Sequence, residues 1–91
     1  MPSIQVTKIA EDRYEVHVED RAATVHTVTV KSEYAHKLSA GLVDSSVLVE
    51  KSFEYLLERE PNTSILRSFD LSVIAHYFPE YEKVIGKLLN K

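Results

Sequence analysis

The first third of the chain alternates between apolar and polar side chains. Over residues 3–31 a hydrophobic residue recurs at about every second position, separated mainly by Thr, Glu, His and Lys. A period of two is typical of β-strands with one buried face. Polar interruptions at 10–13 and 20–22 divide the stretch. The pattern therefore predicts a three-stranded antiparallel meander over about 3–9, 13–19 and 23–31, with one face on the core and the other in water.

The third predicted strand contains a conflict within its own pattern. Val28 and Val30 share a face with His26, whereas Val25 points to the opposite face. One unbroken alternation cannot bury all three valines. We therefore expect a β-bulge or a strong twist near His26.

The remainder of the chain, residues 32–91, has the three-to-four-residue spacing of helices. A short helix is predicted over 32–38, and Gly41 is placed to end it in the left-handed conformation. A second helix is predicted over 44–60, and Pro61 stops it. Its apolar stripe consists of Val49, Phe53, Leu56 and Leu57.

Beyond Pro61 the pattern predicts three shorter helices. Asn62 to Ser64 can cap a turn of helix over 65–69, and Asp70 can cap another over 71–78. Pro79 suits the first turn of a last helix over 79–90. The predicted fold is therefore α+β, a β-meander (1–31) followed by three or more helices packed on one face (32–91).

Composition then limits the chemistry. Ninety-one residues are enough for one domain, 1–91. The chain has no cysteine, which excludes disulfides, thiolate nucleophiles and cysteine metal sites. Without a signal-peptide pattern or an apolar run of about 20 residues, we expect a cytoplasmic protein outside the membrane. A net charge of −3 lacks the basic excess typical of nucleic-acid binders.

The residues that could carry catalysis or bind a metal do not form a known motif. The histidines do not occur at HExxH or HxxxH spacing, so we expect no metal and no cofactor. The serines form neither a GxSxG elbow nor an SxxK motif, so we expect no enzyme. The four histidines, interpreted as surface or core-edge residues, are His17, His26, His36 and His76.

Two charged ridges recur at four-residue spacing on predicted helices. The acidic ridge is Glu50, Glu54 and Glu58, and the basic ridge is Lys83, Lys87 and Lys91. A solvated helix face is one interpretation, and docking to a cationic partner is the other. The lysines could also face the acidic ridge, either within the chain or across a dimer.

Aromatic residues gather around Pro79. Tyr77, Phe78 and Tyr81 are interpreted as core-filling side chains, because a small domain needs large residues to fill its interior. A ligand platform is the alternative.

Alternating Thr27-Val28-Thr29-Val30 is followed by the segments 32–38 and 45–57. Over residues 25–60 this arrangement resembles a ribbon–helix–helix unit, which occurs in many repressors and antitoxins and dimerises by pairing its strands. The resemblance implies DNA contacts from the outward strand residues and phosphate contacts at the start of the second helix. The residues in those positions are Thr27, Thr29, Lys31, Ser45 and Ser46.

The sequence departs from the ribbon–helix–helix pattern in three ways. Two further strands precede the strand that would form the ribbon, its outward face is poor in Arg and Lys, and the acidic ridge with Asp44 adds negative potential. We therefore take the topology from this resemblance rather than DNA binding. The stretch 57–81 also resembles a segment shared by short prokaryotic proteins of unknown function, which implies a prokaryotic origin and no particular chemistry.

These observations predict a small non-enzymatic protein-interaction or regulatory module that forms a homodimer. Its expected partner is a protein rather than nucleic acid. One alternative is an antitoxin-like DNA-binding regulator, and another is a small-molecule binder or minor enzyme. The residues that a small-molecule cleft would use are Tyr34, His36, Arg67, Asp70, His76 and Tyr77.

Overall fold

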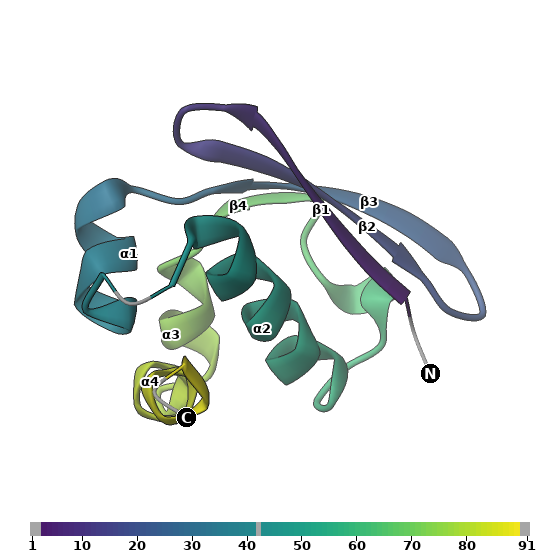
Figure 1. Cartoon of the computed structure of the whole chain (residues 1–91). Helices are drawn as coiled ribbons and strands as arrows, with labels where there is room; N and C mark the ends of the chain where they lie inside the picture. Colours follow the sequence, from purple (N-terminus) through teal and green to yellow (C-terminus); the bar gives the residue numbers. More distant parts are fainter. Residues whose placement is uncertain (1–2, 42, 90–91) are drawn as a thin grey trace.

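The computed structural model describes residues 3–41 and 43–89 as two layers, a β-sheet and a set of helices that cover one of its faces (Figure 1). The strands are β1 (Ser3–Ala10), β2 (Arg13–Glu19), β3 (Ala23–Thr29) and β4 (Ser68–Asp70). The helices are α1 (Ser32–Ser39), α2 (Ser45–Leu57), the 3₁₀ turn η1 (Asn62–Ser64), α3 (Val73–Tyr77) and α4 (Tyr81–Leu89). The α+β class and the placement of helices on one face are as predicted.

The sheet is mixed and has the order β1-β2-β3-β4. The first three strands pair antiparallel, but β4 joins the far side of β3 in parallel. The amide of Thr27 donates to the Arg67 carbonyl at 2.7 Å, and the amide of Leu71 donates to the Thr29 carbonyl at 2.9 Å. The prediction of a purely antiparallel, three-stranded sheet is therefore wrong.

The fourth strand replaces the helix predicted over 65–69. Ser68 to Asp70 are too few to form a strand by themselves, and they are extended because they pair with Thr27 to Thr29. The preceding Asn62 to Ser64 form the turn η1 instead of capping a helix. A pairing partner 41 residues away in the sequence thus decides the local conformation.

The bulge expected near His26 is absent, since β2 and β3 pair in unbroken register from Arg13–Thr29 to Glu19–Ala23. Val25 lies on the outer face of the sheet and is 41% exposed, while His26 takes the buried position at 1% exposure. The conflict in the pattern is resolved by burying a histidine that finds hydrogen-bond partners. The one register shift between β1 and β2 lies between Lys8 and Ala10.

The helices begin and end close to their predicted bounds. Asp44 caps α2, as expected, and its carboxylate accepts from the Ser45 amide at 3.0 Å. The left-handed conformation after α1 begins at Ala40 (φ 53°) and continues at Gly41 (φ 74°). The predicted helix over 44–60 ends at Leu57, and those over 71–78 and 79–90 shorten to α3 and α4. Asn90 lies outside the described residues.

The core lies between the sheet and α2. Val49 and Phe53 are fully buried and Leu56 nearly so, which confirms these positions of the apolar stripe predicted for α2, whereas Leu57 is half-buried. Tyr81 of α4 is also fully buried, and its hydroxyl lies 2.6 Å from Ser52 Oγ. Ser52 donates its only hydroxyl proton to the Leu48 carbonyl at 2.7 Å, so Tyr81 is the donor to Ser52. Among the helices of the described chain, none is long and apolar enough to cross a bilayer.

Candidate functional site

The described residues form a groove beside β4. It lies where the C-terminal end of α2, the segment 60–69 and α3 meet, and its volume is about 350 Å³. We call it the 56–78 groove after the ends of its lining. The side chains that line it are Leu56, Glu60, Ser64, Ile65, Leu66, Phe69, Val73, Ile74, Tyr77 and Phe78.

The chain builds this groove from buried walls and an exposed rim. Ile65 and Ile74 are anchored in the core, whereas Leu66 is 48% exposed and Tyr77 is 68% exposed. Large apolar side chains that remain in contact with water around a hollow are typical of surfaces that bind another molecule. The apolar lining offers burial, while the carboxylate of Glu60 and the hydroxyl of Ser64 offer polar contacts.

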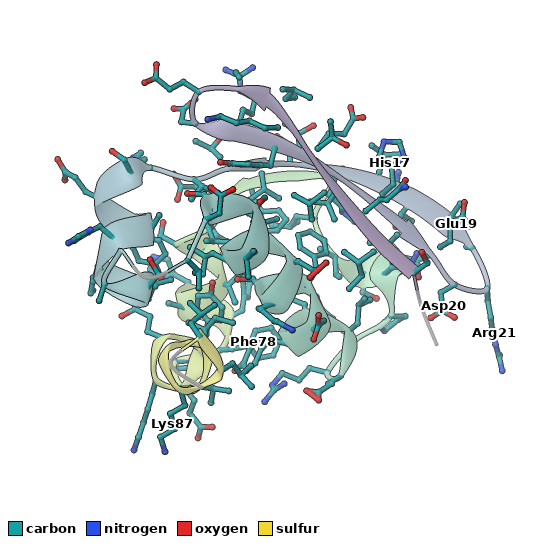
Figure 2. All side chains as sticks on the ribbon, in the orientation of Figure 1. His17, Glu19, Asp20, Arg21, Phe78 and Lys87 are labelled. Carbon is teal, nitrogen blue, oxygen red and sulfur yellow. The ribbon has the colours of Figure 1, made fainter. Side chains whose placement is uncertain are left out.

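A second hollow of about 220 Å³ shares Tyr77 and Phe78 with the lining of the groove. Phe78 packs edge-on against Tyr55, with ring centroids 6.0 Å apart, and lies beneath α2 (Figure 2). The guanidinium of Arg59 stacks 3.6 Å from the centre of the Tyr55 ring and donates to the Tyr55 carbonyl at 2.9 Å. The second hollow is therefore lined by aromatic rings and by Arg59, whose guanidinium is already bonded to Tyr55.

Glu60 lines the groove, and Glu80 lines the second hollow. Neither carboxylate forms an ion pair with any residue in the described ranges. Arg59, in contrast, is held by Tyr55 and lies 3.9 Å from Glu58. The 56–78 groove therefore presents the unpaired carboxylate of Glu60, whereas the second hollow is lined by both Glu80 and the cation of Arg59.

A buried hydrogen-bond chain fixes the segment that forms the groove wall. The carbonyl of Leu66 can only accept, so His26 Nδ1 donates to it at 2.7 Å. His26 Nε2 then accepts from the Thr24 hydroxyl at 2.9 Å, and Thr24 Oγ1 accepts from Asn62 Nδ2 at 2.9 Å. Asn62 Nδ2 also donates to the Ala22 carbonyl at 2.8 Å. Every member is satisfied only while the imidazole is neutral.

Burial lowers the pKa of His26 below 6.5, and the nearby Arg67 acts in the same direction, while the bond to the Leu66 carbonyl opposes it. The neutral tautomer with a proton on Nδ1 is the one that completes the chain described above.

The residues implied by the ribbon–helix–helix resemblance lie on other surfaces. Thr27 and Thr29 lie on the outer face of the sheet, where they pair across the strands with Glu15 and Asp70 respectively. β3 pairs with β2 along its length and with β4 over Thr27 to Thr29, so this part of its backbone is not available to pair with a second copy. Lys31 Nζ lies 3.7 Å from the Asp70 carboxylate.

The start of α2 is shielded from phosphate by its own cap. The Ser45 amide donates to Asp44 Oδ1 at 3.0 Å, and the Ser46 hydroxyl donates to Asp44 Oδ2 at 3.3 Å. A carboxylate therefore occupies the position at which an anion would bind the helix N-terminus.

The two charged ridges do not meet within the part of the chain that the structure describes. Glu54 pairs with Lys51 at 3.5 Å, and Glu58 lies 3.9 Å from Arg59. Glu50 forms no ion pair in these ranges. On α4, Lys87 projects away from α2 (Figure 2), and Lys83 is also exposed. Lys91 lies outside the described residues.

The residues suggested for a small-molecule cleft do not converge. Tyr77 lines the groove, but Tyr34 donates to Glu82 Oε2 at 2.7 Å and so joins α1 to α4. Burial and this bond raise the pKa of the Tyr34 hydroxyl. The same bond, with a contribution from Lys37, lowers the pKa of Glu82. His36, Arg67, Asp70 and His76 do not line the groove.

The aromatic cluster around Pro79 divides by role. Tyr81 is core-filling, as expected, whereas Tyr77 is a rim residue. The histidines are dispersed, and no group of three His, Asp or Glu side chains could hold a metal among residues 3–41 and 43–89. His17 is exposed and lies 2.7 Å from Glu15, but His26 is buried, so its interpretation as a surface or edge residue is wrong.

Sequence reasoning missed the groove because its lining comes from three segments that meet only in the folded chain. The sequence pattern predicts a helix at Leu66 that the structure does not have, and it places Glu60 at the end of a longer α2. The one available signal was the run of apolar residues at Ile65, Leu66 and Phe69, which exceeds what a short capped turn can bury.

Comparisons with models of protein families, with curated proteins and with solved structures find no match for this chain. The two resemblances noted in the sequence therefore stay predictions, and function must be argued from the chain's own geometry.

Proposed function

We propose that the chain is a small, non-enzymatic interaction module, and that the 56–78 groove receives apolar side chains from a segment of a partner protein. The observation that carries the proposal is the groove itself, an apolar hollow of about 350 Å³ rimmed by the exposed Leu66 and Tyr77. Binding energy at protein interfaces is concentrated in such places, where an anchor side chain is desolvated in a hollow.

The shape favours a peptide segment as the occupant. Tyr77 and Phe78 line both the groove and a second hollow, so two anchor positions lie close together. An extended segment or a helix of a partner can present two apolar side chains at such positions. A compact small molecule would fill only one of the hollows.

The charge favours a cationic segment. Glu60 borders one hollow and Glu80 the other, and neither is paired within the described residues. A Lys or Arg beside each apolar anchor would meet these carboxylates and would also be steered by the chain's net charge of −3. We therefore infer a partner segment that alternates large apolar residues with Lys or Arg.

Binding is favoured over catalysis by the polar groups of the groove. The side chains of Glu60, Ser64 and Tyr77 form no hydrogen bond with one another among the described residues. A serine nucleophile needs an adjacent base, and here the hydroxyl and the carboxylate are not joined.

A peptide selection tests the proposal. A library of random 12-residue peptides is selected against the full chain, and the enriched peptides are measured by isothermal titration calorimetry. We expect aromatic or large aliphatic anchors beside Lys or Arg, with Kd values near micromolar. Tyr77→Ala should weaken binding about tenfold or more, because it removes a rim side chain that the ligand would cover.

The control is Val25→Ala, which removes an exposed apolar side chain from the outer face of the sheet, far from the groove lining. It should leave the Kd unchanged, whereas Glu60→Gln should weaken binding several-fold at low salt and less at high salt. Failure to enrich any peptide, or enriched peptides that bind Tyr77→Ala and Val25→Ala equally well, would refute the proposal.

A further inference from the structure

One edge of the sheet is unprotected. β1 pairs with β2 on one side and has no neighbouring strand on the other within the described residues. The opposite edge strand, β4, is only three residues long, which limits pairing there. β1 has eight residues, and α2 is the helix that packs against it. An unpaired strand edge of this length is a template for another strand.

The N-terminal half of β1 lacks the features that usually protect an edge. Ser3 to Thr7 contain no charged residue and no proline, and they pair with β2 in unbroken register. The protective features lie outside this segment: Pro2 precedes it in the sequence, and the charge of Lys8 and the register shift between Lys8 and Ala10 follow it. Pairing is therefore possible over Ser3 to Thr7 and blocked beyond them.

We propose that β1 pairs with the β1 strand of a second copy, antiparallel and about a two-fold axis at Gln5. This register sets Ile4 opposite the partner's Val6 on the inner face. It sets Ser3 opposite the partner's Thr7 on the outer face, and Gln5 opposite its own copy. Apolar side chains thus meet apolar ones and polar side chains meet polar ones, so the segment is complementary to itself.

The neighbouring registers are worse. An axis at Val6 would set Ile4 against the partner's Lys8, which places an ammonium group beside a half-buried apolar side chain. An axis at Ile4 would pair only three of the described residues, Ser3 to Gln5. The axis at Gln5 pairs five residues without opposing any charge to an apolar group.

The pairing would bury apolar surface that is exposed to solvent in the single chain. Ile4 and Val6 pack against the core but are only half-buried. A strand added beyond them shields both, and the two sheets become one of eight strands. A domain of this size buries a smaller fraction of its apolar surface than a larger one, so this burial favours the dimer.

This dimer is independent of the proposed groove. The groove is lined by Phe69 of β4, at the opposite edge of the sheet from β1. Pairing at β1 therefore leaves both grooves open, and the dimer presents two of them. A partner with two cationic segments would bind such a dimer more tightly than it binds one chain.

Introducing a charge at Gln5, the residue on the two-fold axis, tests the pairing. Sedimentation velocity should show the full chain as a dimer at tens of micromolar. Gln5→Lys and Gln5→Glu each oppose like charges across the axis, so each variant should dissociate at least tenfold more readily. An equimolar mixture of the two should recover the dimer. Ala23→Lys, which adds the same charge on the outer face two strands from the edge, should stay dimeric.

A disulfide tests the register. The natural chain has no cysteine. Gln5→Cys should cross-link two copies under mild oxidation, because directly opposed Cα atoms of an antiparallel pair lie about 4.5–5.5 Å apart, within disulfide range. Ser3→Cys should not, since its own copy would lie four residues along the strand, roughly 13 Å away.

A monomeric wild-type chain at tens of micromolar overturns the dimer. A dimer that survives Gln5→Lys, or in which Ser3→Cys cross-links as readily as Gln5→Cys, overturns the proposed pairing. None of these results bears on the groove, whose test is peptide binding.

Discussion

The imidazole Nδ1 of His26 lies 2.7 Å from the carbonyl oxygen of Leu66, although forty residues separate the two in the sequence. The bond joins the buried face of β3 to the wall of the 56–78 groove. Because His26 also accepts from Thr24, the histidine has no unsatisfied polar atom when neutral. A buried polar residue thus specifies how the segment 61–67 docks on the sheet.

We predict that the protein loses stability as the pH falls below about 6.5. His26 has a folded-state pKa below that of an unfolded histidine, so the unfolded chain takes up the proton first. The stabilisation is complete above pH 6.5 and declines as the pH falls toward the folded-state pKa. Urea unfolding at pH 7.5 and 5.5 should show this loss.

The His26 pH prediction has its own control. His26→Gln should flatten the pH dependence in this range, whereas His36→Gln, at an exposed position, should leave it unchanged. An NMR titration in which His26 protonates at or above pH 6.5 would contradict the prediction.

We predict that Asn62→Ala destabilises the fold by about 1–3 kcal/mol. The side-chain amide of Asn62 donates to the Ala22 carbonyl and to the Thr24 hydroxyl. Its removal therefore takes one hydrogen-bond donor away from each of these two acceptors. Chemical unfolding measures the change. Thr63→Ala, at the exposed next position of η1, should stay within about 0.5 kcal/mol of the natural protein. Equal effects of the two substitutions would argue against a structural role for the Asn62 bonds.

We predict unequal costs for the two ends of the Ser52–Tyr81 bond. Ser52→Ala removes the acceptor of a buried tyrosine hydroxyl and should cost about 1–3 kcal/mol. Tyr81→Phe should cost less, roughly 0.5–1.5 kcal/mol, because Ser52 keeps its bond to the Leu48 carbonyl. The double variant should cost less than the sum of the two single changes, since both remove one interaction. Strict additivity in chemical unfolding would show that the bond contributes nothing.

The local features of the fold can be predicted from the sequence. The period-two pattern of residues 3–31 places Tyr14, Val16 and Val18 on one buried face, and the structure has them there. The Asp44 cap and the buried stripe of α2 follow equally from short-range spacing. Such features depend on residues within a few positions of one another, so one sequence suffices to predict them.

The candidate site does not follow in this way. Ser68 to Asp70 form a strand only because β3 offers an open edge, and the groove forms only because that strand draws 60–69 against α3. His26 illustrates the same limit, since its buried Nδ1 needs the Leu66 carbonyl, 40 positions away, and the Thr24 hydroxyl that bonds its Nε2 is itself bonded by Asn62. The periodicity of a short segment does not predict such contacts between residues that are distant in the sequence.

The amino-acid sequence by itself determined the α+β class, the antiparallel order of the first three strands and the buried face of α2. Each of these features is the response of a short segment to its own pattern of apolar and polar residues. The tertiary structure alone decided the parallel fourth strand, the burial of His26 and the 56–78 groove. These depend on pairing and hydrogen bonding between distant segments, whose free energy is gained only when the whole chain has closed.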